Sequence, residues 1–185
     1  MPIEHEVKLA FADLGAARQA VERAGGQLRT SRRLLDDTLF DRSDGALRRT
    51  RMALRIRRDD DHGVLTWKGP VQPGPVKSRE EIETEVADPD ALQSIFEALG
   101  FRPAFRSQKF REEYELDAMM ITVDETPMGV FVEIEGRPEE IPAVTARLGL
   151  TPADFVLESY ATLWRRWCET HGARMGDMLF DVPAI

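Results

Sequence analysis

Residues 2–11 read PIEHEVKLAF, with a charged side chain at every second position from Glu4 to Lys8. Successive side chains of an extended chain point to opposite faces. Glu4, Glu6 and Lys8 therefore share one face, while Val7 and its alternate neighbours share the other. This period of two predicts a β-strand with one charged side.

The same alternation returns along most of the chain. It predicts an extended segment over 27–41 and strands over 52–58, 64–68, 79–86, 105–116, 119–125 and 130–135. Residues 59–63 are typical of a hairpin loop, and the proline-rich residues 69–78 indicate an irregular connection. Helical spacing and capping residues predict helices over 13–24, 89–99, 139–148 and 153–170. This order favours an α+β fold built on an antiparallel sheet or barrel.

Composition and charge predict one soluble domain. The 185 residues are 42% hydrophobic, enough for one core, and no linker divides residues 1–185; a C-terminal helix and tail occupy about 153–185. Lys and Arg number 25 against 33 Asp and Glu, and the net charge of −8 argues against a nucleic-acid partner. No apolar run could span a bilayer, and Glu4 to Lys8 fall where a signal peptide would be apolar. We therefore expect a cytoplasmic protein without a membrane partner.

Sorting every predicted strand by parity extends the charged face across the whole sheet. Besides Glu4, Glu6 and Lys8, this face holds Arg55, Arg57, Lys68, Arg79, Glu81, Glu83, Lys109, Arg111, Asp124, Glu133 and Glu135. The ordinary explanation is a solvated face of an antiparallel sheet. However, like charges repeat within single strands at a spacing of about 7 Å, and they repel unless opposite charges or ions offset them. A closed barrel with this face inward would gather both signs in one polar tunnel.

These residue types indicate a specific chemistry. Several carboxylates around one point suit a hard divalent cation such as Mg²⁺ or Mn²⁺, which prefers oxygen ligands. Arginines and lysines around the same space suit the oxygens of a polyphosphate. Because the chain has no glycine-rich phosphate loop, side chains would have to bind the phosphates. A tunnel with both groups is suited to a metal-bound triphosphate.

The charged motifs resemble those of the CYTH superfamily, the triphosphate tunnel metalloenzymes. The run Glu4-His5-Glu6-Val7-Lys8 matches the ExExK signature of that superfamily. It is followed, in the order of the family, by Leu54-Arg55-Ile56-Arg57, Trp67-Lys68-Gly69-Pro70, Arg79-Glu80-Glu81, Lys109-Phe110-Arg111, Asp124 and residues 129–135. Leu39 departs from the aromatic residue that many members have there. The resemblance covers nearly the whole chain and implies a closed eight-stranded antiparallel β barrel with helices packed outside.

The resemblance also implies a role for each charged residue. Mg²⁺ or Mn²⁺ would be held by Glu4, Glu6, Glu133 and Glu135, with Asp124 as a further ligand or as a residue that positions water. The triphosphate would be bound by Lys8, Arg55, Arg57, Lys68, Arg79, Lys109 and Arg111. Catalysis would involve Glu4, Glu6, Lys8, Lys109, Asp124 and Glu135. Glu81 and Glu83 resemble the tunnel acids that hold the basic residues in place, with a contribution to the metal site as the alternative.

The family resemblance leaves the activity open. The segment around Ser159-Tyr160 is similar to the Ser-Tyr segment of class IV adenylyl cyclases, which convert ATP to cyclic AMP and pyrophosphate. A phosphohydrolase of tripolyphosphate or thiamine triphosphate would use the same cations and carboxylates. A non-catalytic polyphosphate-binding module would be favoured by missing metal carboxylates, and none is missing. The apolar residues 176–180 are expected to dock on the barrel or on a second subunit, which leaves a homodimer open.

Overall fold

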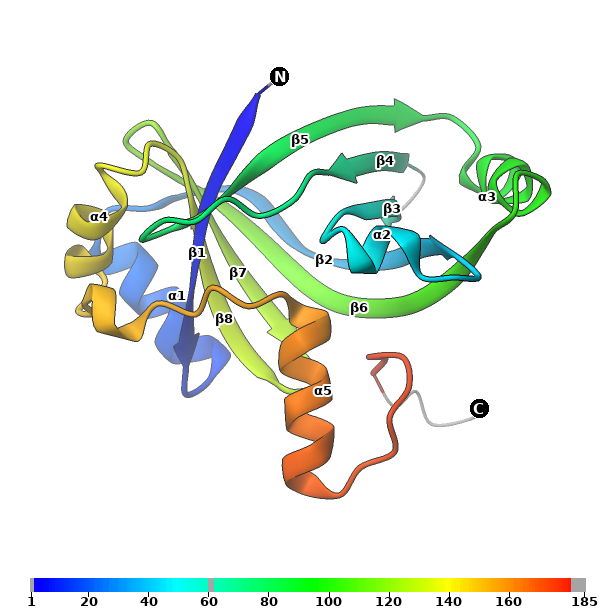
Figure 1. Cartoon of the computed structure of the whole chain (residues 1–185). Coiled ribbons are helices and arrows are strands. Elements are labelled where there is room, and N and C mark those ends of the chain that lie inside the picture. Colours follow the sequence, from blue (N-terminus) through cyan, green and yellow to red (C-terminus); the bar gives the residue numbers. More distant parts are fainter. Residues whose placement is uncertain (1, 60–61, 181–185) are drawn as a thin grey trace.

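The computed structural model describes residues 2–59 and 62–180, and its centre is a closed barrel of eight strands (Figure 1). The strands are β1 (Ile3–Phe11), β2 (Gln27–Arg42), β3 (Ala53–Asp59), β4 (His62–Lys68), β5 (Lys77–Val86), β6 (Phe101–Leu116), β7 (Met119–Thr126) and β8 (Gly129–Glu135). Around the barrel they follow the order β1-β5-β4-β3-β2-β6-β7-β8, with all neighbours antiparallel. The predicted α+β fold with a closed antiparallel barrel is confirmed.

Two strands begin earlier than the sequence pattern predicts. Strand β5 starts at Lys77, which lies opposite Glu6 of β1, although the three prolines before it suggested a loop reaching Ser78. Strand β6 starts at Phe101 because it pairs with β2 along nearly the full length of both strands. Residues 60–61 of the predicted hairpin loop lie outside the described part of the chain.

The helices lie outside the barrel, as predicted (Figure 1). They are α1 (Leu14–Arg23), α2 (Ala46–Arg49), α3 (Pro89–Ala98), α4 (Ile141–Arg147) and α5 (Tyr160–His171), with a 3₁₀ turn over Pro152–Asp154. The side chains of Asp13, Asp88 and Ser159 accept backbone N–H groups at the starts of α1, α3 and α5. Predicting the last helix from residue 153 was wrong, because Ser159 is extended and caps a helix that begins at Tyr160. No helix within the described ranges is long and apolar enough to cross a membrane.

The main hydrophobic core lies between the outer face of the barrel and α1 and α4. Leu9, Val21, Ile121 and Ile134 are completely buried in this layer. Leu9, Ile121 and Ile134 point outward from β1, β7 and β8. The alternate side chains of these strands must therefore point into the barrel. Not every outward apolar side chain is covered by a helix, since Ile82 on β5 is 47% exposed.

The C-terminal part of the chain, residues 155–180, is called the strap. It pairs with two short stretches of barrel strand that lack a neighbouring strand on one side because the strands are staggered. Before α5, the backbones of Val156 and Lys8 exchange two hydrogen bonds of 3.2 and 2.9 Å, next to the point where pairing of β1 with β5 ends. After α5, Met178 makes a parallel bridge with Ser107 of β6, where pairing with β7 has not yet begun. Met178 is only 1% exposed, so residues 176–180 dock on the barrel; residues 181–185 lie outside the described part.

Candidate active site

The charged face predicted by parity lies inside the barrel. Lys8 on β1 lies opposite Glu133 on β8, and Arg111 on β6 lies opposite Asp124 on β7. Lys8 is 2% exposed and Asp124 is 0% exposed. Charges buried to this degree need partners of opposite sign, since desolvation of an isolated charge is very costly. The barrel thus brings the predicted cations and carboxylates into one tunnel.

Glu4 is the centre of one group of charges in the tunnel. The ammonium Nζ of Lys68 lies 2.9 Å from both carboxylate oxygens of Glu4 and 2.7 Å from Glu81. The Nε of Arg79 is 3.6 Å from the same Glu4 carboxylate. Lys68 and Arg79 therefore lie where a phosphate oxygen could replace or join the carboxylates as their partner.

Glu6 and Glu133 form a second group with two lysines. Lys8 Nζ lies 3.3 Å from Glu6 and 3.1 Å from Glu133, and Lys77 Nζ also contacts Glu6. Burial alone would lower the pKa of Lys8, but the two carboxylates hold that pKa above its usual value. Burial and the charge of Lys8 lower the pKa of Lys77 to about 8 despite its contact with Glu6. Lys77 is thus a buried cation of the site that sequence analysis placed in a loop.

Asp124 forms the most densely bonded group. Its Oδ2 accepts from Lys109 Nζ at 2.8 Å, Arg111 Nη2 at 2.6 Å and the Tyr160 hydroxyl at 2.8 Å, while Oδ1 accepts from Arg111 Nε at 2.7 Å. Burial raises the pKa of Asp124, but Arg111 and Lys109 outweigh burial and keep that pKa below its usual value. In this arrangement Asp124 orients two cations and a phenol, and its role as a metal ligand stays a prediction.

Arg55 and Arg57 share a carboxylate that sequence analysis left out of the site. Asp37 on β2 accepts from Arg57 Nε at 2.7 Å and from Nη2 at 2.9 Å, and Arg55 Nη1 lies 3.7 Å away. Arg55 Nη2 donates to the Thr66 hydroxyl at 2.9 Å. Burial raises the pKa of Asp37, yet Arg57 and Arg55 hold that pKa well below its usual range. Asp37 therefore stays ionised and fixes both guanidinium groups.

Two of the tunnel guanidinium groups have an Nε donor without a hydrogen-bond acceptor, although Arg79 Nε lies 3.6 Å from the Glu4 carboxylate. The Nε atoms of Arg55 and Arg79 are buried, and neither has a hydrogen-bond acceptor among the described residues. Buried polar groups are nearly always hydrogen-bonded, so a buried donor without a protein acceptor in a charged cavity is available to an oxygen of a ligand. Both donors call for an anionic oxygen.

The carboxylates supply the oxygen ligands that the divalent cation implied by the resemblance prefers. Partial burial and the negative charge of Glu4 raise the pKa of Glu135 to about 7, and burial together with Glu81 and Glu6 raises the pKa of Glu4. These carboxylates repel one another, and a hard dication with oxygen ligands would remove that repulsion. Within residues 2–59 and 62–180, no three acidic, His or Cys side chains already converge on one point. Glu4, Glu6, Glu133 and Glu135 would have to exchange lysine contacts for the cation.

The sequence did not place Asp37 or Lys77 in the site, and it indicated Tyr160 only through the Ser-Tyr resemblance. Asp37 lies in the extended segment 27–41, which shows no clear charged face in the sequence, although the antiparallel pairing of β2 with β3 places it opposite Arg57. Lys77 was predicted to lie in an irregular connection because Pro70, Pro73 and Pro75 precede it, whereas it begins β5. Tyr160 was indicated by the Ser-Tyr segment and lay inside the helix predicted over 153–170; in the structure its hydroxyl donates to Asp124 in the tunnel.

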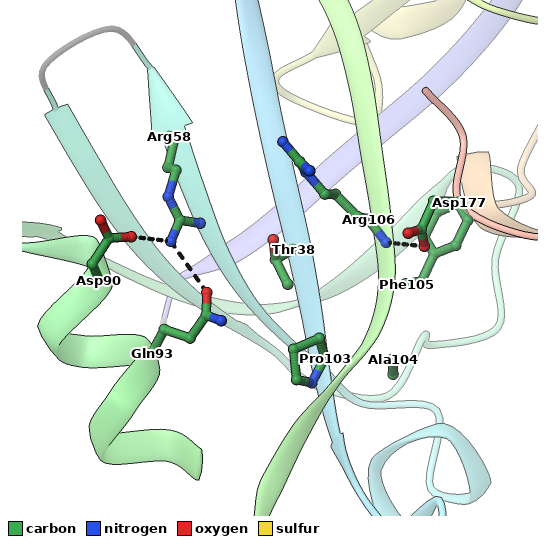
Figure 2. A pocket seen from close by; sticks show the side chains of 9 residues that line it. All are labelled: Thr38, Arg58, Asp90, Gln93, Pro103, Ala104, Phe105, Arg106 and Asp177. Carbon is green, nitrogen blue, oxygen red and sulfur yellow. Dashed lines mark hydrogen bonds and ion pairs between the residues drawn. The ribbon is translucent and has the colours of Figure 1, made fainter. Parts of the chain in front are cut away.

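A separate hollow lies on the outer face of the barrel between α3 and the strap (Figure 2). It has a volume of about 470 Å³. Arg58 donates to Asp90 at 2.6 Å and to Gln93 at 3.1 Å, and the backbone N–H of Arg106 donates to Asp177 at 2.8 Å. The guanidinium group of Arg106 donates to Asp36 at 2.7 Å, so both arginines of this hollow have an acidic partner.

The matching family model agrees with the geometry. The model of the CYTH domain matches residues 2–160, which is most of the chain and includes every predicted tunnel residue. The chain belongs to the CYTH family. Its barrel is therefore the triphosphate tunnel fold, and the family implies dependence on a divalent metal.

Similar proteins carry related names. A Methanocaldococcus jannaschii protein provisionally named adenylate cyclase is 28% identical over 172 residues, covering 87% of this CYTH chain and 98% of the relative. A Vibrio parahaemolyticus structure with the same provisional name has a TM-score of 0.78 and 20% identity, over 88% of this chain and 98% of its own. A Hippeastrum protein, provisionally an adenylyl cyclase with a dominant triphosphatase activity, has a TM-score of 0.65 and 21% identity, over 95% and 98% of the two chains.

Proposed function

We propose that this CYTH protein is a metal-dependent adenylyl cyclase that converts ATP to cyclic AMP and pyrophosphate. The observation that carries the triphosphate assignment is the pair of buried Nε donors of Arg55 and Arg79, which have no hydrogen-bond acceptor among the described residues of a tunnel of lysines and arginines. Such donors are matched by phosphate oxygens, which accept charge-assisted hydrogen bonds. The choice of cyclase is supported by the 28% identical relative, which the chain matches over 98% of that relative's length.

In the proposed reaction, the ribose 3′ oxygen attacks the α-phosphorus. The O3′–P bond forms, the bond from the α-phosphorus to the bridging oxygen breaks, and pyrophosphate leaves with the electron pair while the 3′ proton passes to solvent. Arg55, Arg57 and Lys109 bind the phosphate oxygens and stabilise the charge that develops on the leaving group. A divalent cation on Glu4 and its neighbouring carboxylates would neutralise phosphate charge and orient the reacting oxygens.

A triphosphate phosphohydrolase is the second candidate. It would direct water to the terminal phosphorus of tripolyphosphate or thiamine triphosphate with the same cations. The dominant triphosphatase activity of the Hippeastrum protein is the observation that favours it, although 21% identity relates the two chains by fold alone. A non-catalytic polyphosphate-binding module is disfavoured, because Glu4, Glu6, Glu133 and Glu135 are all present.

The product assay separates these candidates. Purified protein is incubated with Mg²⁺ or Mn²⁺ and, in parallel, ATP, tripolyphosphate and thiamine triphosphate, and the products are resolved by chromatography. Cyclic AMP with an equal amount of pyrophosphate from ATP supports the cyclase. Orthophosphate without a cyclic product contradicts it and identifies a phosphohydrolase, named by its fastest substrate. Tight binding without any product would indicate the binding module.

A further inference from the structure

Lysine occurs only inside the tunnel. Of the 25 Lys and Arg residues of the chain, four are lysines, and these are Lys8, Lys68, Lys77 and Lys109. Each is buried, with between 2% and 9% of its surface exposed. Lysine is normally a surface residue and is almost never buried without a partner. Because the chain uses only arginine elsewhere, this distribution indicates that the tunnel needs a property of lysine that arginine lacks.

Three of the lysines contact the glutamates that are proposed as ligands of the divalent cation. The pairs are Lys68 with Glu4 at 2.9 Å, Lys8 with Glu6 at 3.3 Å and with Glu133 at 3.1 Å, and Lys77 with Glu6. Together with Glu135, four carboxylates and three ammonium groups sum to 3 − 4 = −1, before the nearby arginines are counted. So small a net charge attracts a dication only weakly. The lysines therefore act as the counter-ions of these carboxylates.

The fourth lysine, Lys109, has a different partner. Its Nζ lies 2.8 Å from Asp124 and 4.8 Å from the ring centroid of Tyr160, whose hydroxyl donates to the same Asp124. The ring of Tyr160 also lies 5.2 Å from Lys8 Nζ. The distance from Lys109 Nζ to Glu133 is 4.0 Å, which is long for an ion pair. Lys109 thus neutralises Asp124 rather than the glutamates.

The tunnel arginines are held in another way. Arg57 donates from two nitrogens to the two carboxylate oxygens of Asp37, and Arg111 donates in the same way to Asp124. Two parallel hydrogen bonds fix the planar guanidinium group. An ammonium group is instead a point charge on a flexible four-carbon stem, so it can turn from one anion to another. The lysine contacts are therefore the ones that can be exchanged.

We infer that Lys8, Lys68 and Lys77 keep the divalent cation off the tunnel glutamates until a triphosphate takes over their ammonium groups, so that the two ligands bind cooperatively. This inference rests on the proposed function, since it assumes a triphosphate ligand. Phosphate oxygens accept charge-assisted hydrogen bonds from ammonium groups, and each lysine that turns to a phosphate leaves a carboxylate to the cation. Without phosphate, the cation would share those carboxylates with like-charged neighbours, which repel it.

The positions of the lysines also select the length of the anion. Lys68 contacts Glu4, whereas Lys8 and Lys77 contact Glu6, two residues further along β1. Residues two apart on a strand are separated by roughly 7 Å. A single phosphate is too short to take over both groups of lysines, whereas a chain of three phosphates spans them. Coupling to the cation is therefore expected for triphosphates and not for orthophosphate.

Lys77 separates this role from phosphate binding by the matched motifs. Lys8 and Lys68 belong to the motifs of the family, whereas Lys77 forms an ion pair only with Glu6 within the described part of the chain. Substituting Lys77 removes one counter-ion and leaves Glu6 paired with Lys8. Such a variant should bind the cation more tightly when no phosphate is present.

The first test measures the binding of Mn²⁺ alone. Free Mn²⁺ is followed by electron paramagnetic resonance as the full chain is added without phosphate. We expect Lys77→Met to lower the Kd for Mn²⁺ at least fivefold, and Lys77→Arg, which keeps the charge, to stay within twofold of wild type. Arg49→Met is the matched control, because it removes a charge that pairs with the exposed Asp44. Circular dichroism checks that each variant is folded.

The outcomes of this titration decide the role of Lys77. A lower Kd in Lys77→Met alone supports Lys77 as a counter-ion that opposes the cation. An unchanged or higher Kd overturns that role. An equal gain in Arg49→Met would show a general effect of net charge and would overturn it as well.

The second test uses the wild-type protein and does not depend on how a variant folds. Lysine isotopically labelled at Cε gives four NMR signals, all of them from the tunnel. With EDTA present, tripolyphosphate is expected to shift at least three of these signals, whereas an equal concentration of Mg²⁺ alone, without EDTA, shifts none. Orthophosphate at the same concentration should shift fewer signals than tripolyphosphate.

The two tests separate this inference from the proposed function. Lysine signals that shift with Mg²⁺ alone, or that stay unchanged when tripolyphosphate binds, overturn the exchange. If tripolyphosphate does not bind at all, the proposed function fails, and the Mn²⁺ titration, which contains no phosphate, still decides whether Lys77 opposes the cation. A failed product assay with normal binding of tripolyphosphate contradicts the cyclase alone.

Discussion

Each buried charge in the tunnel is fixed by a neighbour of opposite sign. Asp124 holds Lys109 and Arg111, Glu4 holds Lys68, and Asp37 holds Arg57. Removing one partner of a buried pair leaves the other charge desolvated, at a cost of about 3–5 kcal/mol. Substitutions in the tunnel therefore affect stability as well as binding, and conservative variants are needed to separate the two effects.

Asp37→Asn tests the pairing of Asp37 with the arginines. Because the folded-state pKa of Asp37 lies below its unfolded value, the carboxylate stabilises the fold above about pH 4, and this stabilisation is lost as the pH falls through the folded pKa. We expect Asp37→Asn to lower the free energy of unfolding at pH 7 by about 3 kcal/mol. The difference from wild type should shrink in urea titrations below pH 4.

Asp44→Asn is the control for this experiment. Asp44 pairs with Arg49, and its side chain is 59% exposed. Exposed pairs contribute little, so we expect a change within about 0.5 kcal/mol. If Asp44→Asn lowers the free energy of unfolding as much as Asp37→Asn does, burial is not the reason that the Asp37 pair stabilises the fold.

The double substitution Glu4→Gln with Glu6→Gln tests the metal assignment. It keeps the side-chain size but removes two negative charges, so we expect turnover in Mg²⁺ to fall at least a hundredfold with an unchanged circular dichroism spectrum. Glu22→Gln with Glu169→Gln, on exposed helical positions, is the matched control. Full activity of the tunnel variant would remove Glu4 and Glu6 from the metal site.

Arg57→Ala tests polyphosphate binding. The loss of a charge-assisted hydrogen bond, about 1.5–3 kcal/mol, should weaken tripolyphosphate roughly 10- to 100-fold in calorimetry and orthophosphate far less. Arg57→Lys keeps a charge beside Asp37 and should give an intermediate loss. The outward-facing Arg58→Ala should bind as wild type. Equal losses for both phosphates would exclude Arg57 from the polyphosphate site.

At the scale of elements, parity predicts the tunnel well because a strand can place its charged side chains on only one face. The attachment of the strap could not be predicted in this way. It depends on backbone groups that are left unpaired only because neighbouring strands are staggered. Nothing in the local sequence of residues 155–157 marks a partner for Lys8, and the sequence predicted a helix from residue 153. For the same reason the sequence placed Tyr160 inside that predicted helix and could not predict its contact with Asp124.

Removing residues 176–185 tests the strap as an element. The deletion exposes the site that buries Met178 and removes its backbone bonds to Arg106 and Gln108. We expect the free energy of unfolding to fall by at least about 2 kcal/mol, with increased binding of an apolar dye. The single variant Met178→Ala should give a smaller loss of the same sign. Unchanged stability and elution volume would show that the segment is dispensable.

At the scale of the whole molecule, closure of the barrel is what turns a charged sheet face into a site. The closed tunnel contains buried donors without hydrogen-bond acceptors and carboxylates that repel one another. Phosphate oxygens would accept from the donors, and the bound metal would offset the repulsion. A ligand that binds the folded state alone stabilises it by mass action, by about 2.7 kcal/mol at a hundredfold excess over Kd.

Thermal unfolding measures this coupling. For a chain of this size about 1 kcal/mol corresponds to 2–4 °C, so tripolyphosphate with Mg²⁺ at a hundredfold excess over Kd should raise the Tm by roughly 5–10 °C. Orthophosphate at the same concentration should raise it much less. An equal shift with both anions would indicate a general ionic effect rather than a triphosphate site.

The sequence by itself determined the alternation of charged and apolar side chains, and with it the antiparallel strands, the charged inner face and the cations and carboxylates that line it. These follow because the side-chain period of a strand is a local property of the backbone. Only the tertiary structure decided that Asp37 joins Arg57, that Lys77 enters the tunnel, and that Tyr160 covers Lys8 and Lys109. Such contacts depend on register and stagger between strands far apart in the chain, which no local period encodes.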